Sequence, residues 1–340
     1  MSAPPPDYIE GFVCTLATCD IKKWGYIHYQ PSMAGNVLFL VLILLIAVAQ
    51  LVLGIKYKIG GLWVTCMILG LASESIGYVA RILMHPDPFN RVYFLIYLIC
   101  LTLGPVFIAA SIYLCLGRVV VIYGNHISRI RPHIYTLFFM GCDSISLVVQ
   151  AVGGGIAASF PVWNKKMIDL GTHILVAGLS FQVASLFAFS VCSIDFLIRV
   201  KRNPDKLNPD NADLYNSKKF KIFLASILLA TSCLFVRTVF RSVELSEGFS
   251  GKPANNETQF MVLDGVMVIL ASLCLTFMHP GIGIGKEAWQ QARFSMASGR
   301  PLNRPRDDIE TAEYVAPKPK MGKYRPNITY QERTPVEIRE

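Results

Sequence analysis

Nine polar or ionisable side chains lie within segments of the sequence that are otherwise apolar enough to cross a membrane. A charged side chain at the centre of a bilayer costs at least about 2.5–3.5 kcal/mol, so such residues normally face one another or a wet cavity. These side chains therefore mark the expected position of a substrate-binding or gating site. They are Glu74, Tyr78, Arg81, Asp143, Gln150, Arg237, Arg241, Glu244 and Asp264.

The spacing of these residues places them on helical faces. The polar residues of 74–81 and of 237–244 recur at i, i+4 and i+7, and those of 143–150 at i and i+7. Residues at these intervals share one face of a helix, so three segments each present a polar stripe. Asp264 stands alone in a fourth segment.

Two interpretations of these charges are open. In the first, they form a closed salt-bridge network that specifies packing and binds nothing. Glu74 would then pair with Arg237 or Arg241, and Glu244 would pair with Arg81. In the second, they form an amphiphile site, in which the arginines hold an anionic or zwitterionic headgroup and the carboxylates receive an amine.

The composition excludes a soluble domain of this length. Of the 340 residues, 53% are hydrophobic and only 16% are charged, and the mean hydropathy is +0.45. Seven apolar segments reach the roughly 20 residues that cross the hydrocarbon core, and we expect no signal peptide before them. We predict an all-α membrane protein, a bundle of seven transmembrane helices within 34–279. The expected spans are 34–55, 60–84, 92–116, 134–159, 170–194, 220–245 and 257–279.

Polar tails flank this bundle. Residues 1–33 form the first tail, and residues 280–340 mix Pro with charged residues and contain few large apolar side chains. We expect the second tail to be mostly disordered. The stretch around Trp289 and Phe294 is a candidate for a short helix on the membrane surface.

The distribution of Lys and Arg between the loops predicts the orientation. Loops 1–2, 3–4 and 5–6 carry eleven of these residues, whereas loops 2–3, 4–5 and 6–7 carry four. The positive-inside rule then places the N-terminus outside and the C-terminus in the cytoplasm. With this orientation, most of the charges inside the membrane fall in its outer half. Asp143 and Gln150 lie deeper, toward the cytoplasm. The net charge of +9 reflects these cytoplasmic loops rather than a nucleic-acid partner.

Two features of the predicted outer side are candidates for covalent modification. Asn256 begins an Asn-Glu-Thr glycosylation sequon in loop 6–7. Cys14 and Cys19 lie on the outer tail, where a disulfide could persist.

Proline and glycine within the spans have predicted structural roles. Pro105, in the middle of the third span, should kink the helix or free a backbone carbonyl. Gly153, Gly154 and Gly155 should let a neighbouring helix approach closely. A flexible or broken helix end is the alternative for this triplet.

Sequence signals for catalysis are lacking. The six histidines contain no i, i+4 pair of the kind that forms a helical zinc site. The sequence has no G-x-S-x-G, no P-loop and no dinucleotide fingerprint. We therefore expect neither an enzyme nor a cofactor, and an intramembrane zinc hydrolase is the least favoured alternative.

Taken in order, the motifs resemble those of the fungal RTA-like family, also called lipid-translocating exporters, over about residues 26–281. The resemblance rests on E-x-x-G-Y-x-x-R at 74–81, P-x-x-x-A-A-x-x-Y at 105–113 followed by Gly117-Arg118, D-x-x-S-x-x-x-Q-x-x-G-G-G at 143–155, Gly178 and Gln182, R-x-x-x-R-x-x-E at 237–244, and His279-Pro280-Gly281. One departure is Met261, where the family tends to have Tyr in E-x-x-x-Y-x-x-D.

The resemblance implies a protein of the fungal plasma membrane that exports or flips sphingoid long-chain bases and gives resistance to toxic amphiphiles. Membrane lipids and amphiphiles would be its partners, with Glu74, Asp264 and Glu244 receiving the amine and the arginines balancing them or holding phosphate. The alternative is a receptor-like sensor of lipid asymmetry or membrane stress, whose tail would bind cytoplasmic partners. Movement of porphyrins or sterol-like amphiphiles is less favoured.

Overall fold

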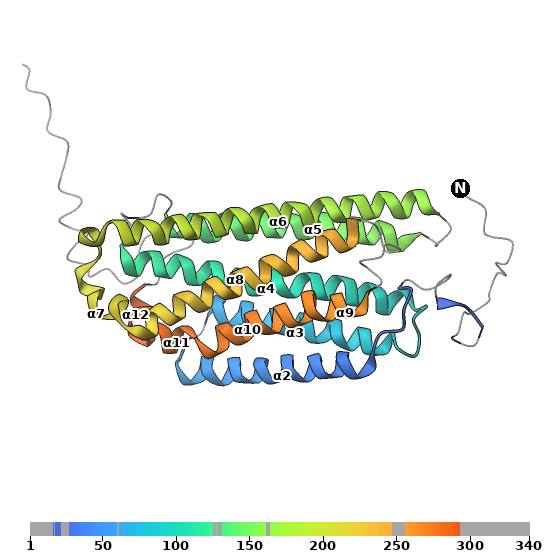
Figure 1. Cartoon of the computed structure of the whole chain (residues 1–340), viewed down its shortest axis with the longest axis horizontal. Coiled ribbons are helices and arrows are strands. Elements are labelled where there is room, and N and C mark those ends of the chain that lie inside the picture. Colours follow the sequence, from blue (N-terminus) through green and yellow to red (C-terminus); the bar gives the residue numbers. More distant parts are fainter. Residues whose placement is uncertain are drawn as a thin grey trace, which may run out of the picture. The chain divides into compact units, whose positions relative to one another are not determined.

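The computed structural model describes residues 16, 18–21, 27–59, 61–124, 127, 131–160, 164–246 and 256–292. Within these ranges the fold is all-α, and seven helices are long and apolar enough to cross a membrane, as predicted. They lie side by side along a common direction (Figure 1). The spans are α2 (Met33–Lys56), α3 (Leu62–Leu83), α4 (Arg91–Tyr123), α5 (Pro132–Ser159), α6 (Lys165–Arg202), α8 (Lys218–Ser246), and a last span built from α9 (Glu257–Phe260), the π-helical turn η4 (Met261–Val266) and α10 (Met267–Phe277).

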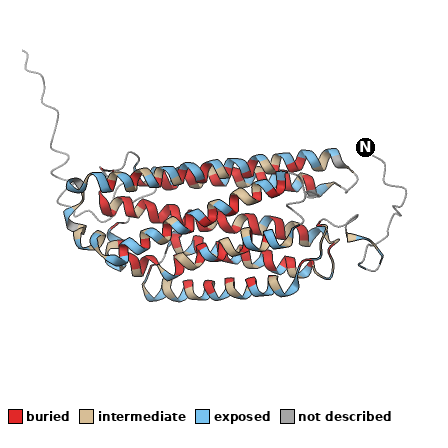
Figure 2. Cartoon of the chain, in the orientation of Figure 1, coloured by how far each residue is buried: buried red, intermediate tan, exposed pale blue. Residues whose placement is uncertain are grey.

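Spans that follow one another in sequence pack against one another, and α10 closes the bundle by packing on both α8 and α2. α4 is the most buried of the spans, which agrees with its apolar residues lying on all sides. Buried residues line the inner faces of the bundle, and exposed residues line its outer faces (Figure 2). The exposed residues include large apolar side chains such as Leu45, Val148 and Phe277. An apolar outer face is what a lipid environment requires.

Two spans are longer than the sequence predicted. α4 continues to Tyr123 rather than ending near 116, because Val119, Val120 and Ile122 are buried in the bundle. α6 extends from Lys165 to Arg202, and its last turns include an Asp195–Arg199 pair at i, i+4 with an N–O distance of 2.7 Å. The prediction stopped these helices at their first charged residues, although a helix can extend past the membrane boundary.

The bundle also continues beyond the predicted boundary at 279. After α10 the chain forms α11 (Pro280–Gly283) and α12 (Lys286–Gln291). Trp289 is buried: its ring lies edge-on to Trp63, and the Arg118 guanidinium stacks on it 3.7 Å from the ring centre. The segment therefore packs onto the bundle, not onto a membrane surface. Phe294 and the remainder of the tail lie outside the described residues, so their disorder stays a prediction.

The structure describes two of the three residues predicted as modification sites, Asn256 and Cys19. Asn256 caps α9: its side-chain oxygen accepts a hydrogen bond from Gln259 N at 3.3 Å. The cap does not use the amide nitrogen that glycosylation would modify. Cys19 is disulfide-bonded, but Cys14 lies outside the described residues, so the pairing of these two stays a prediction.

Of the three consecutive glycines in α5, Gly153 is the one that a packed helix requires. A Cβ added there would lie 2.4 Å from Leu175 N and 2.6 Å from Gly171 O, both backbone atoms of α6. A Cβ on Gly154 would make an ordinary contact with the Leu175 side chain, and one on Gly155 would meet nothing within 4 Å. Because α5 is helical through Ser159, the broken-helix alternative is wrong.

We expect Gly153→Ala to lower the free energy of unfolding by about 1–3 kcal/mol, since two rigid backbones would have to separate. Gly155→Ala is the matched control and should change it by less than about 1 kcal/mol. Thermal unfolding of the two purified variants measures the difference. Equal stability of both variants would show that α5 and α6 do not approach closely at Gly153.

Candidate functional site

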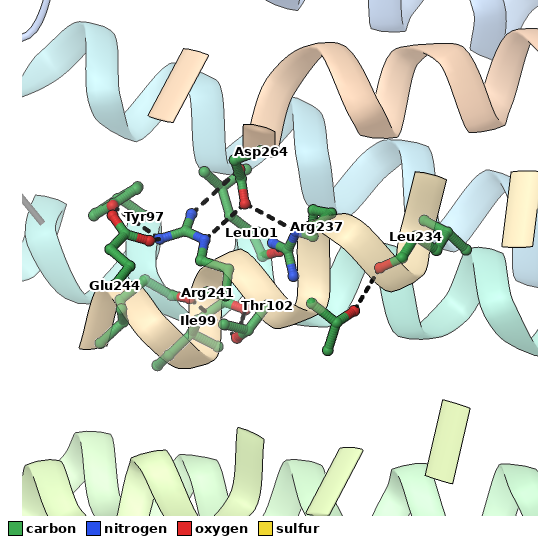
Figure 3. A network of polar contacts seen from close by, with 11 residues as sticks. Tyr97, Ile99, Leu101, Thr102, Leu234, Arg237, Arg241, Glu244 and Asp264 are labelled. Carbon is green, nitrogen blue, oxygen red and sulfur yellow. Dashed lines mark hydrogen bonds and ion pairs between the residues drawn. The ribbon is translucent and has the colours of Figure 1, made fainter. Parts of the chain in front are cut away.

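An ion-pair network occupies the contact between α8, the last span and α4 (Figure 3). Asp264 lies between two arginines: its Oδ1 is 2.9 Å from Arg237 Nε and 2.7 Å from Arg241 Nε. Arg241 also donates from Nη2 to Asp264 Oδ2 at 3.3 Å, and from Nη1 to Glu244 Oε2 at 3.1 Å and to the Tyr97 hydroxyl at 3.2 Å. All four charged residues are at most 2% exposed. The network holds two positive and two negative groups and is therefore neutral.

The proline of α4 provides the network with an additional acceptor. Pro105 has no N–H, so the carbonyl of Leu101, four residues earlier, has no helical donor. Arg237 donates from Nη2 to this carbonyl (Figure 3). The predicted freeing of a backbone carbonyl is confirmed, and its partner is a buried guanidinium from α8.

The position of Asp264 depends on a local change in helix type. It lies in η4, where the chain is π-helical over Met261–Val266. A π-helical turn inserts an extra residue into the helix and changes which side chains face inward, and such turns are frequent at functional sites. Here Asp264 faces α8, whereas Met261 packs against Gly35 of α2.

Arg81 is buried in an aromatic and polar cage and makes no ion pair with another described residue. Its guanidinium lies 3.9 Å from the centre of the Phe260 ring and 4.9 Å from that of Tyr97. It donates to Asn36 Oδ1 and to the Tyr29 hydroxyl, both at 3.0 Å. Burial raises the pKa of Tyr29 to about 12, although the Arg81 charge partly opposes that rise, so the phenol stays neutral at physiological pH.

The polar stripe predicted on α3, formed by Glu74, Tyr78 and Arg81, is fully buried. Several of its polar atoms make no hydrogen bond to another described residue. Among the described residues, neither carboxylate oxygen of Glu74, nor the Tyr78 hydroxyl, nor Arg81 Nη1 has a hydrogen-bond partner. Glu74 lies directly over Gly104 of α4, and the Tyr78 hydroxyl over Gly265 beside Asp264. A Cβ on Gly104 would lie 2.5 Å from Glu74 Oε1, so that glycine makes room for the carboxyl.

The pairing predicted for a closed network is therefore wrong in its details. Within the described ranges, Glu74 makes no ion pair, and Glu244 pairs with Arg241 instead of Arg81. The physical reason is Asp264, which the π-helical turn places between the two arginines of α8. The sequence also failed to indicate Tyr29, Asn36, Tyr97 and Phe260, since single polar or aromatic residues in apolar runs are common in any bundle.

Asp143 and Gln150 lie apart from this network, on α5, and each has its own hydrogen-bond partners. Tyr113 donates to Asp143 Oδ2 at 2.8 Å. Gln150 donates from Nε2 to Ser146 Oγ at 2.6 Å and to Gln182 Oε1 at 2.8 Å. The nine predicted residues thus divide into seven around the contact of α3, α8 and η4, and two on α5. No group of three His, Cys, Asp or Glu gathers for a metal in the described part of the chain.

The fold and site define a class: a seven-helix integral membrane protein with a buried network of charges. The chain belongs to the family of RTA1-like proteins, whose model matches residues 67–287. It is 32% identical over 235 residues to the sphingoid long-chain base transporter RSB1 of Saccharomyces cerevisiae, a match that covers 61% of each chain. This region therefore spans less than two thirds of that relative.

Two further relatives come from the same yeast. Protein RTA1 is 24% identical over 297 residues, covering 78% of this chain and 90% of the relative. Protoporphyrin uptake protein 1 is 28% identical over 210 residues, covering 61% of this chain and 65% of the relative. No solved structure gives a significant match.

Proposed function

We propose that the chain is a translocase of the plasma membrane that exports cationic amphiphilic lipids such as sphingoid long-chain bases, with its N-terminus outside and its C-terminus in the cytoplasm. Similarity to a protein named as a sphingoid long-chain base transporter supports the substrate class. Similarity to a porphyrin uptake protein supports amphiphile movement more generally. Such transport would give resistance to toxic amphiphiles.

The observation that carries this proposal is the set of open hydrogen-bonding positions on α3. Both oxygens of Glu74 and the hydroxyl of Tyr78 are buried without partners among the described residues. Leaving such groups unsatisfied costs about 1–3 kcal/mol each, so a ligand that satisfies them gains affinity. A sphingoid headgroup carries one amine and hydroxyl groups, which match a carboxylate and a phenol one helical turn apart.

The other two acidic residues are less suited to receive an amine in this conformation. Both oxygens of Asp264 face arginines, and Glu244 accepts from Arg241. We therefore assign amine contact to Glu74, and to the four-residue network the role of holding α8 and the last span against α3 and α4. The hydrocarbon tail would lie among apolar helix faces.

Reconstitution tests this function without other cell components. Purified protein in liposomes should accelerate transbilayer movement of a labelled sphingoid base well above the rate in protein-free liposomes. A receptor-like sensor would bind the base without moving it. Binding with no protein-dependent movement would therefore favour the sensor and contradict the translocase.

A further inference from the structure

Asp143 is a buried carboxyl without a cationic partner. It is 2% exposed in the middle of α5. Its Oδ2 accepts from the Tyr113 hydroxyl at 2.8 Å, and its Oδ1 has no hydrogen-bond partner in the described ranges. No Lys, Arg or His of those ranges lies within ion-pair distance of it. This distinguishes Asp143 from Asp264, which has two arginines.

The groups that face Asp143 come from the two helices packed on α5 and from α5 itself. α4 contributes Tyr113, α6 contributes Ser185, and α5 contributes the adjacent Cys142. The Tyr113 ring packs 4.5 Å from the centre of Phe189, so the surroundings are otherwise aromatic. A phenol and a thiol are neutral at physiological pH. An ionised carboxylate here would cost several kcal/mol with only one hydrogen bond in return.

Further polar side chains lie along the same α5–α6 contact. Ser146 and Gln150 follow Asp143 on the same face of α5, and Gln182 and Ser185 face them from α6. Ser146 Oγ donates to Gly178 O at 2.7 Å. Gln150, whose Oε1 has no partner in the described part, borders an apolar groove together with Leu98, Thr102, Leu147, Gly154 and Leu175.

We propose that Asp143 is a proton-binding site that takes up and releases one proton in each transport cycle, so that the amphiphile moves in exchange for protons. The proton enters from the aqueous phase on one side of the membrane and leaves on the other, and no bond other than the acid O–H forms or breaks. This coupling rests on the proposed translocase function. Exchange of one monocation for one proton moves no net charge, so a pH gradient drives it and the membrane potential does not.

The proton site can be tested without any transport. Infrared difference spectra of the purified full-length protein between high and low pH should contain the C=O stretch of a protonated acid. Asp143→Asn, which keeps the shape and the oxygen that accepts from Tyr113, should lose one component of this band. Asp169→Asn removes an exposed acid on α6 instead, and should keep the component that is missing in Asp143→Asn. An unchanged band in Asp143→Asn would overturn the proton site.

Coupling is tested in proteoliposomes with a quaternary N-trimethyl sphingoid base, whose fixed charge prevents passive redistribution as the free amine. Exchange of the unmodified base, which keeps the amine protons that Glu74 would accept, is measured at equal pH and reports the translocase alone. A gradient of one pH unit should let wild type and Asp169→Asn accumulate the base about tenfold. Asp143→Asn should lose this accumulation.

Two results would overturn the coupling: accumulation by Asp143→Asn at the wild-type level, or wild-type accumulation that follows the membrane potential instead of the pH gradient. A wild-type protein that fails even equal-pH exchange contradicts the translocase, and with it the coupling. The infrared measurement still decides, in that case, whether Asp143 binds a proton.

Discussion

Asp264→Asn is expected to lower the free energy of unfolding of the purified protein by about 3–5 kcal/mol, the range observed when one partner of a buried ion pair is removed. The substitution keeps the size of the side chain but removes the charge that faces both Arg237 and Arg241. Glu244 would remain as the single carboxylate paired in the network, so one buried guanidinium would be uncompensated. Denaturant or thermal unfolding in detergent measures this loss.

A surface pair provides the matched control. Asp195 and Arg199 also form an Asp–Arg pair at 2.7 Å, but the Asp195 side chain is 49% exposed. Asp195→Asn should therefore cost no more than about 1 kcal/mol. Combining Asp264→Asn with Arg237→Gln removes one negative and one positive charge together, and should recover part of the stability. A loss below about 1 kcal/mol in Asp264→Asn would mean that the network does not stabilise the bundle.

The sequence predicted the parts of this network, but not its pairing. Helical periodicity placed Arg237, Arg241 and Glu244 on one face, and the cost of burying charge required that face to turn inward. The pairing depends on η4, because a π-helical turn changes the facing of Asp264 without a composition signal that marks it. Assigning residues to a helical face from their spacing assumes the same rotation at every residue. Such an assignment therefore does not extend to Asp264, where the π-helical turn changes that rotation.

For Pro105 and the glycines of α5, the sequence predicted the local effect but not the partner in a neighbouring helix. A proline in a span predicts a free carbonyl, and the structure confirms this at Leu101. The sequence could not indicate that Arg237 would use that carbonyl, because the contact joins residues 136 positions apart. Likewise, three equivalent glycines at 153–155 cannot be ranked before the position of α6 is known.

Glu74→Gln should separate binding from stability. Glu74 makes no ion pair or hydrogen bond among the described residues, so its replacement by an isosteric amide should change the free energy of unfolding by less than about 1 kcal/mol. If Glu74 receives the substrate amine, the variant loses a charge-assisted hydrogen bond worth about 1.5–3 kcal/mol. The rate of sphingoid-base movement in liposomes should then fall by about 10- to 160-fold.

The substrate provides the control for this prediction. An N-acetylated base keeps the tail and the hydroxyls but lacks the cationic amine, so its movement should be affected little by Glu74→Gln. The preference of wild type for the amine over the amide should therefore disappear in the variant. Tyr78→Phe removes only a neutral hydroxyl, and should reduce movement of both compounds by a similar, smaller factor, corresponding to about 0.5–1.5 kcal/mol.

Comparing the stability of Glu74→Gln with that of Asp264→Asn distinguishes two roles for Glu74: a member of the ion-pair network, or a residue that binds the substrate amine. If Glu74→Gln unfolds as readily as Asp264→Asn, then Glu74 balances Arg237 and Arg241 at longer range, and the open positions on α3 are part of the network. If the variant is stable and moves the base at the wild-type rate, Glu74 does not contact the amine. Only a stable variant that loses selectivity for the amine is consistent with a carboxyl group that is unpaired in this conformation and receives a cation.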